Sequence, residues 1–122
     1  MQLPEPRNPQ GAVTDEWLTK MQGREQLLER LFGMFTKTEA DRLGQVHEAM
    51  EAGDLENARY LIHSIKGAAA TMGAERLRQA AQSMENAIKQ GEDVLAMGLL
   101  GAVDQEMADA CARMRMYLDQ GA

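Results

Sequence analysis

The stretch ARYLIHSIKGAAATMG, residues 58–73, decides the fold that we expect for this chain. Apolar and small residues recur through it at alternating intervals of three and four, which is the spacing of one buried face of an α-helix. That stripe begins one turn earlier and consists of Leu55, Ala58, Ile62, Ile65, Ala69 and Met72. The spacing predicts a core-facing helix over residues 54–72.

A second set of residues in this helix follows the same rhythm, about 120° around the helix axis from the apolar stripe. It consists of Arg59, His63, Lys66, Gly67 and Ala70. A glycine inside a helix costs about 0.5–1 kcal/mol relative to alanine, so a helix built only for stability would not place Gly67 there. We infer that this face leaves room for a partner to approach His63.

The rest of the chain carries three further patterns of apolar residues at helical spacing. Together with the central helix they cover residues 24–52, 54–72, 74–90 and 92–118. Single glycines at positions 53, 73 and 91 separate these segments and suit short turns after helix ends. Long helices joined by short turns pack against their neighbours in antiparallel order, so we predict an all-α fold, an antiparallel four-helix bundle.

Two details of this bundle are less regular. A short additional N-terminal helix around Trp17 precedes it, and either Thr14 or Asp15 can cap that helix. The first long pattern weakens over residues 36–41, where a capping-box-like sequence occurs, so one long helix or two shorter ones would both fit. We favour one helix.

The length of 122 residues predicts a single domain. All three prolines lie within the first nine residues, among polar neighbours. Proline removes a backbone donor and disfavours a helix interior, so we expect residues 1–12 to form a flexible tail and residues 13–120 to form the bundle.

Composition excludes several classes of protein. The net charge of −6 argues against a nucleic-acid binder, which needs a basic surface. The single cysteine, Cys111, excludes an intramolecular disulfide and fits a reducing compartment. The longest apolar run, residues 94–103, is about half of the ~20 residues that a membrane span needs, so we expect a buried helix there. With no signal-peptide pattern at the N-terminus, we expect a soluble, cytoplasmic protein without a membrane partner.

Residues 63–69, HSIKGAA, followed by Met72 and Gly73, resemble the signature of histidine-containing phosphotransfer (HPt) domains. In that family a histidine is followed by any residue, an aliphatic residue, lysine, glycine and two small residues, then by an aliphatic residue and glycine. Every position is filled here with an allowed residue type. The resemblance extends over roughly residues 13–119 and implies the four-helix bundle found in such domains.

The resemblance also implies roles for individual residues. The family's phosphoryl group is carried on Nε2 of the histidine, here His63. Family members have a glutamine or glutamate 22 residues later that orients this ring, and Glu85 occupies that position, with Gln82 as a second candidate. By their residue types, Gly67 and Ala70 would either let a partner's loops lie against the helix or allow close packing between helices. Arg59 would either steer an acidic partner or have a plain surface role.

The chemistry of these residue types agrees with the resemblance. A neutral imidazole offers a nitrogen lone pair near pH 7 and can hold a phosphoryl group as a reactive covalent intermediate. Lys66, one turn after His63, is placed to offset the phosphoryl charge as a flexible cation. The other ring nitrogen needs an acceptor that holds the correct tautomer.

We therefore expect a phosphocarrier rather than an enzyme, one that relays a phosphoryl group through His63 between a sensor or hybrid histidine kinase and the receiver aspartate of a response regulator. The chain has no glycine-rich nucleotide loop, so its partners would supply catalysis. We expect no cofactor in the chain, with Mg²⁺ bound only by the receiver. A monomer is the expected state, and the initial methionine with the full set of helices favours a stand-alone carrier.

Two other hypotheses stay open. A helical adaptor could use the same face for binding without phosphotransfer. A metal- or cofactor-binding bundle has less support, because the two histidines are isolated from each other and from Cys111.

His47 has no lysine–glycine neighbour, so we interpret it as a surface or boundary histidine. We interpret Cys111 as a small core residue and most methionines, including Met97, as core fillers.

Overall fold

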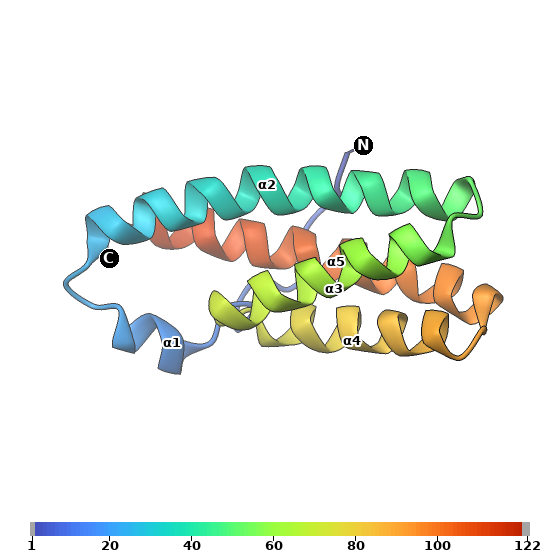
Figure 1. The fold of residues 1–122 in the computed structure, drawn as a ribbon. Helices are drawn as coiled ribbons and strands as arrows, with labels where there is room; N and C mark the ends of the chain where they lie inside the picture. The colour runs from blue at the N-terminus through green and yellow to red at the C-terminus, as the bar shows by residue number, and fades with distance from the viewer. Residues whose placement is uncertain (1, 121–122) are drawn as a thin grey trace.

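The computed structural model describes residues 2–120 of the chain. Five helices follow one another in it, and no strand occurs among the described residues. They are α1 (Asp15–Lys20), α2 (Glu25–Glu51), α3 (Leu55–Thr71), α4 (Glu75–Lys89) and α5 (Asp93–Asp119). Figure 1 shows the last four as long, roughly parallel rods, with α1 at one end of them.

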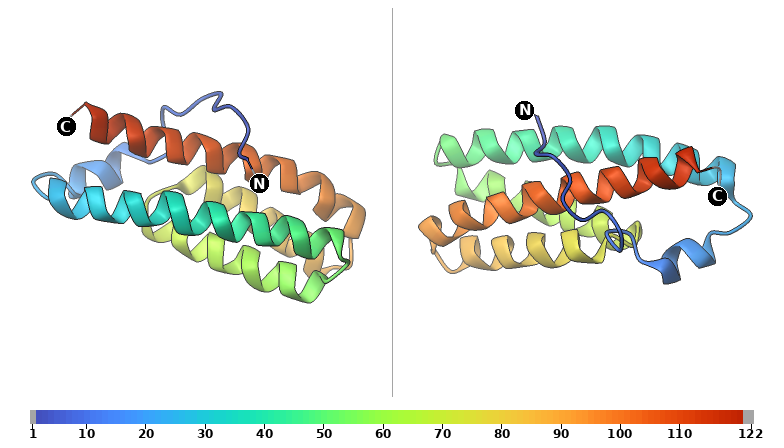
Figure 2. Two further views of the ribbon diagram at one scale, coloured as in Figure 1. Left: turned by 90° about the horizontal axis from the view of Figure 1, so that it is seen from above. Right: turned by 180° about the vertical axis from the view of Figure 1, so that it is seen from behind.

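The four long helices form the predicted antiparallel bundle. Consecutive long helices pack against each other, and α5 closes the ring by packing against α2. The views from above and from behind show the same up-and-down order (Figure 2). The prediction of one long first helix is also confirmed, because α2 runs without a break through residues 36–41.

The turns between the long helices share one geometry. Gly53, Gly73 and Gly91 have φ angles of 73°, 70° and 74°. In each turn the N–H of the residue after the glycine donates to a carbonyl five positions earlier, over 2.8 or 2.9 Å. This closure satisfies a carbonyl that the ending helix would otherwise leave unpaired, and it requires the left-handed conformation that glycine adopts without strain.

Gly73 has a second reason to be glycine. A Cβ there would lie 2.5 Å from side-chain carbons of Trp17 on α1. The indole Nε1 of Trp17 donates to the carbonyl of Thr71 over 2.9 Å, and the N–H of Thr14 donates to the carbonyl of Gly73 over 3.0 Å. These contacts fasten α1 to the α3–α4 turn, with the Thr14 hydroxyl capping α1.

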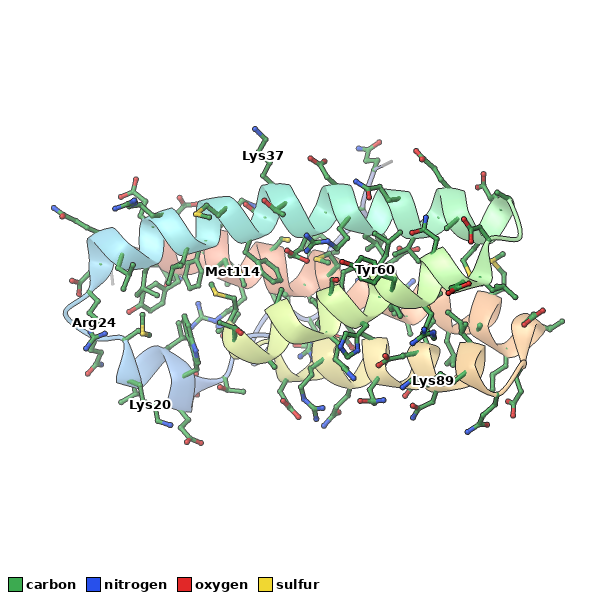
Figure 3. All side chains as sticks on the ribbon, in the orientation of Figure 1. Lys20, Arg24, Lys37, Tyr60, Lys89 and Met114 are labelled. Atoms are coloured by element: carbon green, nitrogen blue, oxygen red, sulfur yellow. The ribbon has the colours of Figure 1, made fainter. Side chains whose placement is uncertain are left out.

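One continuous core fills the bundle. Each long helix contributes a buried stripe, and Figure 3 labels Met114 of α5 among the side chains that point inward. The largest fully buried apolar side chains are Phe32, Leu28, Leu43, Ile62, Ile65, Leu77, Met84, Met107 and Met114. Because α3 contributes the predicted stripe, its other face is left for the site.

The start of α5 corrects one expectation. Residues 94–103 are helical, but only part of the run is buried: Val94 is 89% exposed, and Leu95 and Met97 are also exposed. The run is apolar on all sides, whereas a helix at the corner of a bundle buries one stripe, here Ala96, Leu100 and Val103. Within residues 2–120, no helix is both long enough and apolar enough to span a membrane.

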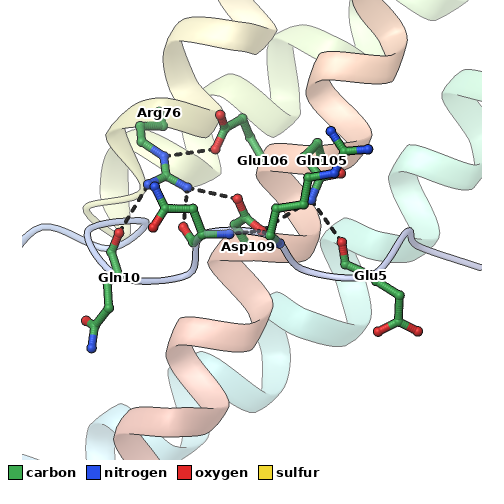
Figure 4. A network of polar contacts seen from close by, with 8 residues as sticks. Glu5, Gln10, Arg76, Gln105, Glu106 and Asp109 are labelled. Atoms are coloured by element: carbon green, nitrogen blue, oxygen red, sulfur yellow. Dashed lines mark hydrogen bonds and ion pairs between the residues drawn. The ribbon is translucent and has the colours of Figure 1, made fainter.

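The N-terminal segment also differs from the expected loose tail. Residues 5–10 cross the outer face of α5 and are held by hydrogen bonds to it and to α4 (Figure 4). The carboxylate of Asp109 accepts from the N–H of Arg7 over 2.8 Å, and the guanidinium of Arg76 donates to the carbonyls of Asn8 and Gln10. Arg76 and Asp109 are themselves paired at 3.0 Å. Met1 lies outside the described residues.

Candidate functional site

The site is centred on the exposed face of α3. His63 stands at mid-helix with 61% of its side chain exposed, and Gly67 and Ala70 are exposed one and two turns further on. These residues lie on this face because the apolar stripe of α3 turns toward the core. The structure therefore brings together the residues that the sequence placed on one face.

Glu85 on α4 lies beneath the imidazole. Its Oε2 is 2.7 Å from Nδ1 of His63, and its side chain is only 1% exposed. An ionised carboxylate can only accept hydrogen bonds, so in the neutral ring this contact assigns the proton to Nδ1 and leaves the lone pair on Nε2. Within residues 2–120, Nε2 makes no hydrogen bond. The nitrogen with the free lone pair is thus the one that does not contact Glu85.

The second oxygen of Glu85 binds Lys66. The ammonium lies 2.7 Å from Oε1 of Glu85 and 3.2 Å from Oε1 of Gln82. Gln82 in turn donates to Asn86 over 2.8 Å. Gln82, the second candidate for orienting the histidine, therefore contacts Lys66 and not the ring. Lys66 itself is mostly buried against α4 rather than extended into solvent.

The charge of Glu85 is favoured by this arrangement. Burial alone would raise the pKa of its carboxyl, but hydrogen bonds and charge from Lys66 and His63 outweigh burial, so the pKa lies below its ordinary value. The carboxylate is therefore ionised near neutral pH. It can stabilise a positive charge that develops on the imidazole ring.

Gly67 has no packing role inside the protein. No atom from another part of the described chain lies within 4 Å of the place that a Cβ on Gly67 would occupy. Close packing between helices, the plain structural explanation for this glycine, is thereby excluded for residues 2–120. Arg59 is half-buried on the same helix, and no ion pair of its own occurs among the described residues.

An apolar groove lies beside this face, between α2 and the C-terminal half of α3. It has a volume of about 240 Å³ and is open to solvent. Its apolar walls come from Leu31, Met34, Phe35, Ala68 and Met72. Met34 is largely exposed at its edge, so the groove offers an apolar contact surface on the α2 side of α3.

Lys89 and His47 make contacts that lie outside the set of residues predicted for the site. Lys89, one turn after Glu85 on α4, places its ammonium 3.7 Å from Oε2 of Glu85, and the spacing of four residues was the only signal for it. His47 is a boundary histidine, as predicted. Its Nε2 lies 2.8 Å from Oδ1 of Asp104 on α5, a contact that no local pattern indicated.

Cys111 is buried in the core, as predicted, and burial raises the pKa of its thiol to about 11. Residues 2–120 contain no group of three or more His, Cys, Asp or Glu side chains placed to share a metal ion.

Comparison with known proteins agrees with this geometry. A family model described as the Hpt domain matches residues 30–120. Among solved structures, the chain is similar to the crystal structure of histidine-containing phosphotransfer protein B (HptB) from Pseudomonas aeruginosa PAO1. That likeness has a TM-score of 0.82 and 25% sequence identity, and it covers 89% of this chain and 96% of the other. No curated protein sequence matches the chain.

Proposed function

The chain belongs to the Hpt domain family, and from this premise we propose that it carries a phosphoryl group on Nε2 of His63 within a phosphorelay. One observation carries the choice of atom. Glu85 holds Nδ1 of His63 at 2.7 Å, while Nε2 faces solvent on a side chain that is 61% exposed. Glu85 therefore orients the imidazole ring, while Nε2, the proposed nucleophile, stays accessible to a partner.

The transfer begins with an aspartyl phosphate on a partner receiver domain. The Nε2 lone pair of His63 attacks phosphorus, the nitrogen–phosphorus bond forms, and the phosphorus–oxygen bond to the aspartate breaks, which releases the aspartate carboxylate. The ring keeps its proton on Nδ1 and becomes positively charged. Glu85 stabilises that charge, and the reverse steps hand the group to another receiver aspartate.

The chain acts in this scheme as a carrier, and its partners supply the catalytic machinery. A sensor or hybrid histidine kinase and response-regulator receivers are the partner classes. Mg²⁺ belongs to the receiver's acidic pocket, and the carrier holds no cofactor of its own. In the unphosphorylated protein, Lys66 contributes its charge through Glu85, to which it is bound over 2.7 Å. A cytoplasmic location and a monomeric state stay predictions.

The docking surface consists of the exposed backbone at Gly67, the small side chain of Ala70 and the groove beside them. The open space around Gly67 supports close approach of a partner loop to His63. Exposed Met34 and the groove walls suit an apolar element of the same partner. Arg59 adds a positive charge that complements an acidic receiver pocket.

The test is phosphoryl uptake from a phosphorylated receiver or kinase domain by three proteins: wild type, His63→Gln and His47→Gln. We expect label on wild type and on His47→Gln, and none on His63→Gln, with equal helicity by circular dichroism. The label should be labile in acid and stable in alkali. Folded wild-type protein that accepts no label from several donors would instead support the adaptor hypothesis.

A further inference from the structure

The two oxygens of the Glu85 carboxylate contact different lysines, Lys66 and Lys89. No sequence pattern distinguishes the roles of these two lysines. Oε1 of Glu85, the oxygen that does not contact the imidazole, binds Lys66 over 2.7 Å. Its Oε2 accepts from Nδ1 of His63 over 2.7 Å and lies 3.7 Å from Nζ of Lys89. Lys89 is therefore the cation that lies beside the same carboxylate oxygen as the imidazole of His63.

The two lysines also differ in freedom. Lys66 is 21% exposed and has a second partner in Gln82, so both contacts would have to break before its ammonium could move. Lys89 is 51% exposed, and its 3.7 Å contact is longer than a hydrogen bond. Lys89 stands at the last turn of α4, where Figure 3 labels it. Its ammonium can leave Glu85 at little cost.

We propose that Lys89 is the residue that contacts the phosphoryl group once it is on Nε2 of His63, an inference that rests on the proposed function. Phosphorylation adds nearly two negative charges beside the ring and makes the ring itself positive. The positive ring pairs more strongly with Oε2 of Glu85, which no longer needs Lys89. The ammonium then moves on its flexible stem to the phosphoryl oxygens.

This assigns different tasks to the two cations. Lys66 holds Glu85 in place in both states of the protein, and thereby positions the imidazole. Lys89 contributes only when the phosphoryl group is present. Loss of Lys89 should therefore leave the unphosphorylated protein unchanged, whereas loss of Lys66 should change the environment of His63 before any phosphoryl group arrives.

The experiment measures the equilibrium partition of the phosphoryl group between the full chain and a receiver domain. It compares wild type, Lys89→Gln, Lys89→Arg and the control Lys20→Gln, which removes an exposed lysine paired with Glu16 on α1. We expect Lys89→Gln to shift the partition toward the receiver by about 3- to 10-fold. Lys89→Arg should restore the partition, and Lys20→Gln should match wild type.

A second readout separates contact with the phosphoryl group from a structural role. Thermal unfolding and the ¹⁵N shifts of the unphosphorylated His63 ring should be the same in Lys89→Gln and wild type, and should change in Lys66→Gln. A Lys89→Gln partition equal to that of Lys20→Gln would overturn the inference while wild type is still labelled. Equal labelling of wild type and His63→Gln would overturn the proposed function itself.

Discussion

The carboxylate Oε2 of Glu85 lies 2.7 Å from Nδ1 of His63, so a residue that is 1% exposed orients one that is largely in solvent. The relationship joins α3 to α4 at the centre of the site. Under the proposed function, it gives the buried glutamate two tasks, one in stability and one in chemistry. Each of these can be tested separately.

Glu85→Gln should lower the free energy of unfolding at pH 7 by about 1–3 kcal/mol, because the amide cannot serve both Lys66 and His63 as an anion does. The pKa of Glu85 is lowered by folding, so its stabilising charge is fully present above the ordinary value of 4.5 and is lost as pH falls through the folded pKa below it. Urea unfolding of both proteins from pH 7 to pH 3.5 measures the difference. The difference in the free energy of unfolding between wild type and Glu85→Gln should become smaller below pH 4.5. A difference that stays constant with pH would mean that the charge of Glu85 contributes nothing to stability.

Gly67→Ala should leave the fold intact and raise the free energy of unfolding by a few tenths and up to about 1 kcal/mol, because alanine favours the helix and the space is empty. Transfer to a receiver should nevertheless slow, and Gly67→Leu should slow it further. Denaturant unfolding and single-turnover transfer measure the two effects. Unchanged transfer rates in both variants would show that partners do not approach at Gly67.

Gly73→Ala should lower stability without slowing transfer, the reverse of what we expect for Gly67→Ala. The residue has a φ of 70°, and a new Cβ would meet Trp17 at 2.5 Å. Both effects oppose folding, so we expect a loss of at least about 1–2 kcal/mol in the free energy of unfolding. Transfer by the folded fraction should be normal. A Gly73→Ala protein as stable as wild type would contradict the docking of α1 against the α3–α4 turn.

Asp109→Ala tests whether the N-terminal segment is held as the structure shows. The carboxylate accepts from the N–H of Arg7 and from Arg76, so its loss should release the segment and cost about 1–3 kcal/mol. Hydrogen exchange at the Arg7 amide should be slow in wild type and fast in the variant. Fast exchange at the Arg7 amide in wild type would instead support the flexible tail that the composition predicts for residues 1–12.

The thiol of Cys111 should be unreactive in the folded protein. Burial raises its pKa to about 11, so at pH 8 it is protonated as well as shielded. An aromatic disulfide reagent should modify it only after unfolding, with a rate that follows denaturant concentration. Rapid modification of native protein would show that the core around α5 opens readily.

The sequence predicted the bundle and the histidine face because both depend on local spacing. Helical periodicity identifies the stripe of α3, and the second face with His63 and Gly67 follows from the same geometry. The glycine turns could be predicted for the same reason. The contact between Glu85 and His63 could be expected only from the family resemblance, since it depends on how α3 and α4 pack.

What the sequence could not predict depends on contacts across the fold. The hydrogen bonds that hold the N-terminal segment to Arg76 and Asp109 join residues far apart in the chain. The contact between His47 and Asp104 does the same. The apolar start of α5 offered no preferred stripe, so its exposed side could not be told from its buried one. The position of Lys89 beside Oε2 of Glu85 could be recognised only from the direction of that carboxylate in the structure.

The most direct test is a phosphorus–nitrogen NMR measurement on uniformly ¹⁵N-labelled protein phosphorylated by a receiver domain. We predict coupling of ³¹P to Nε2 of His63, with the proton retained on Nδ1 beside Glu85. Coupling to Nδ1 of His63, or phosphorylation at His47, would contradict the proposed function at its centre.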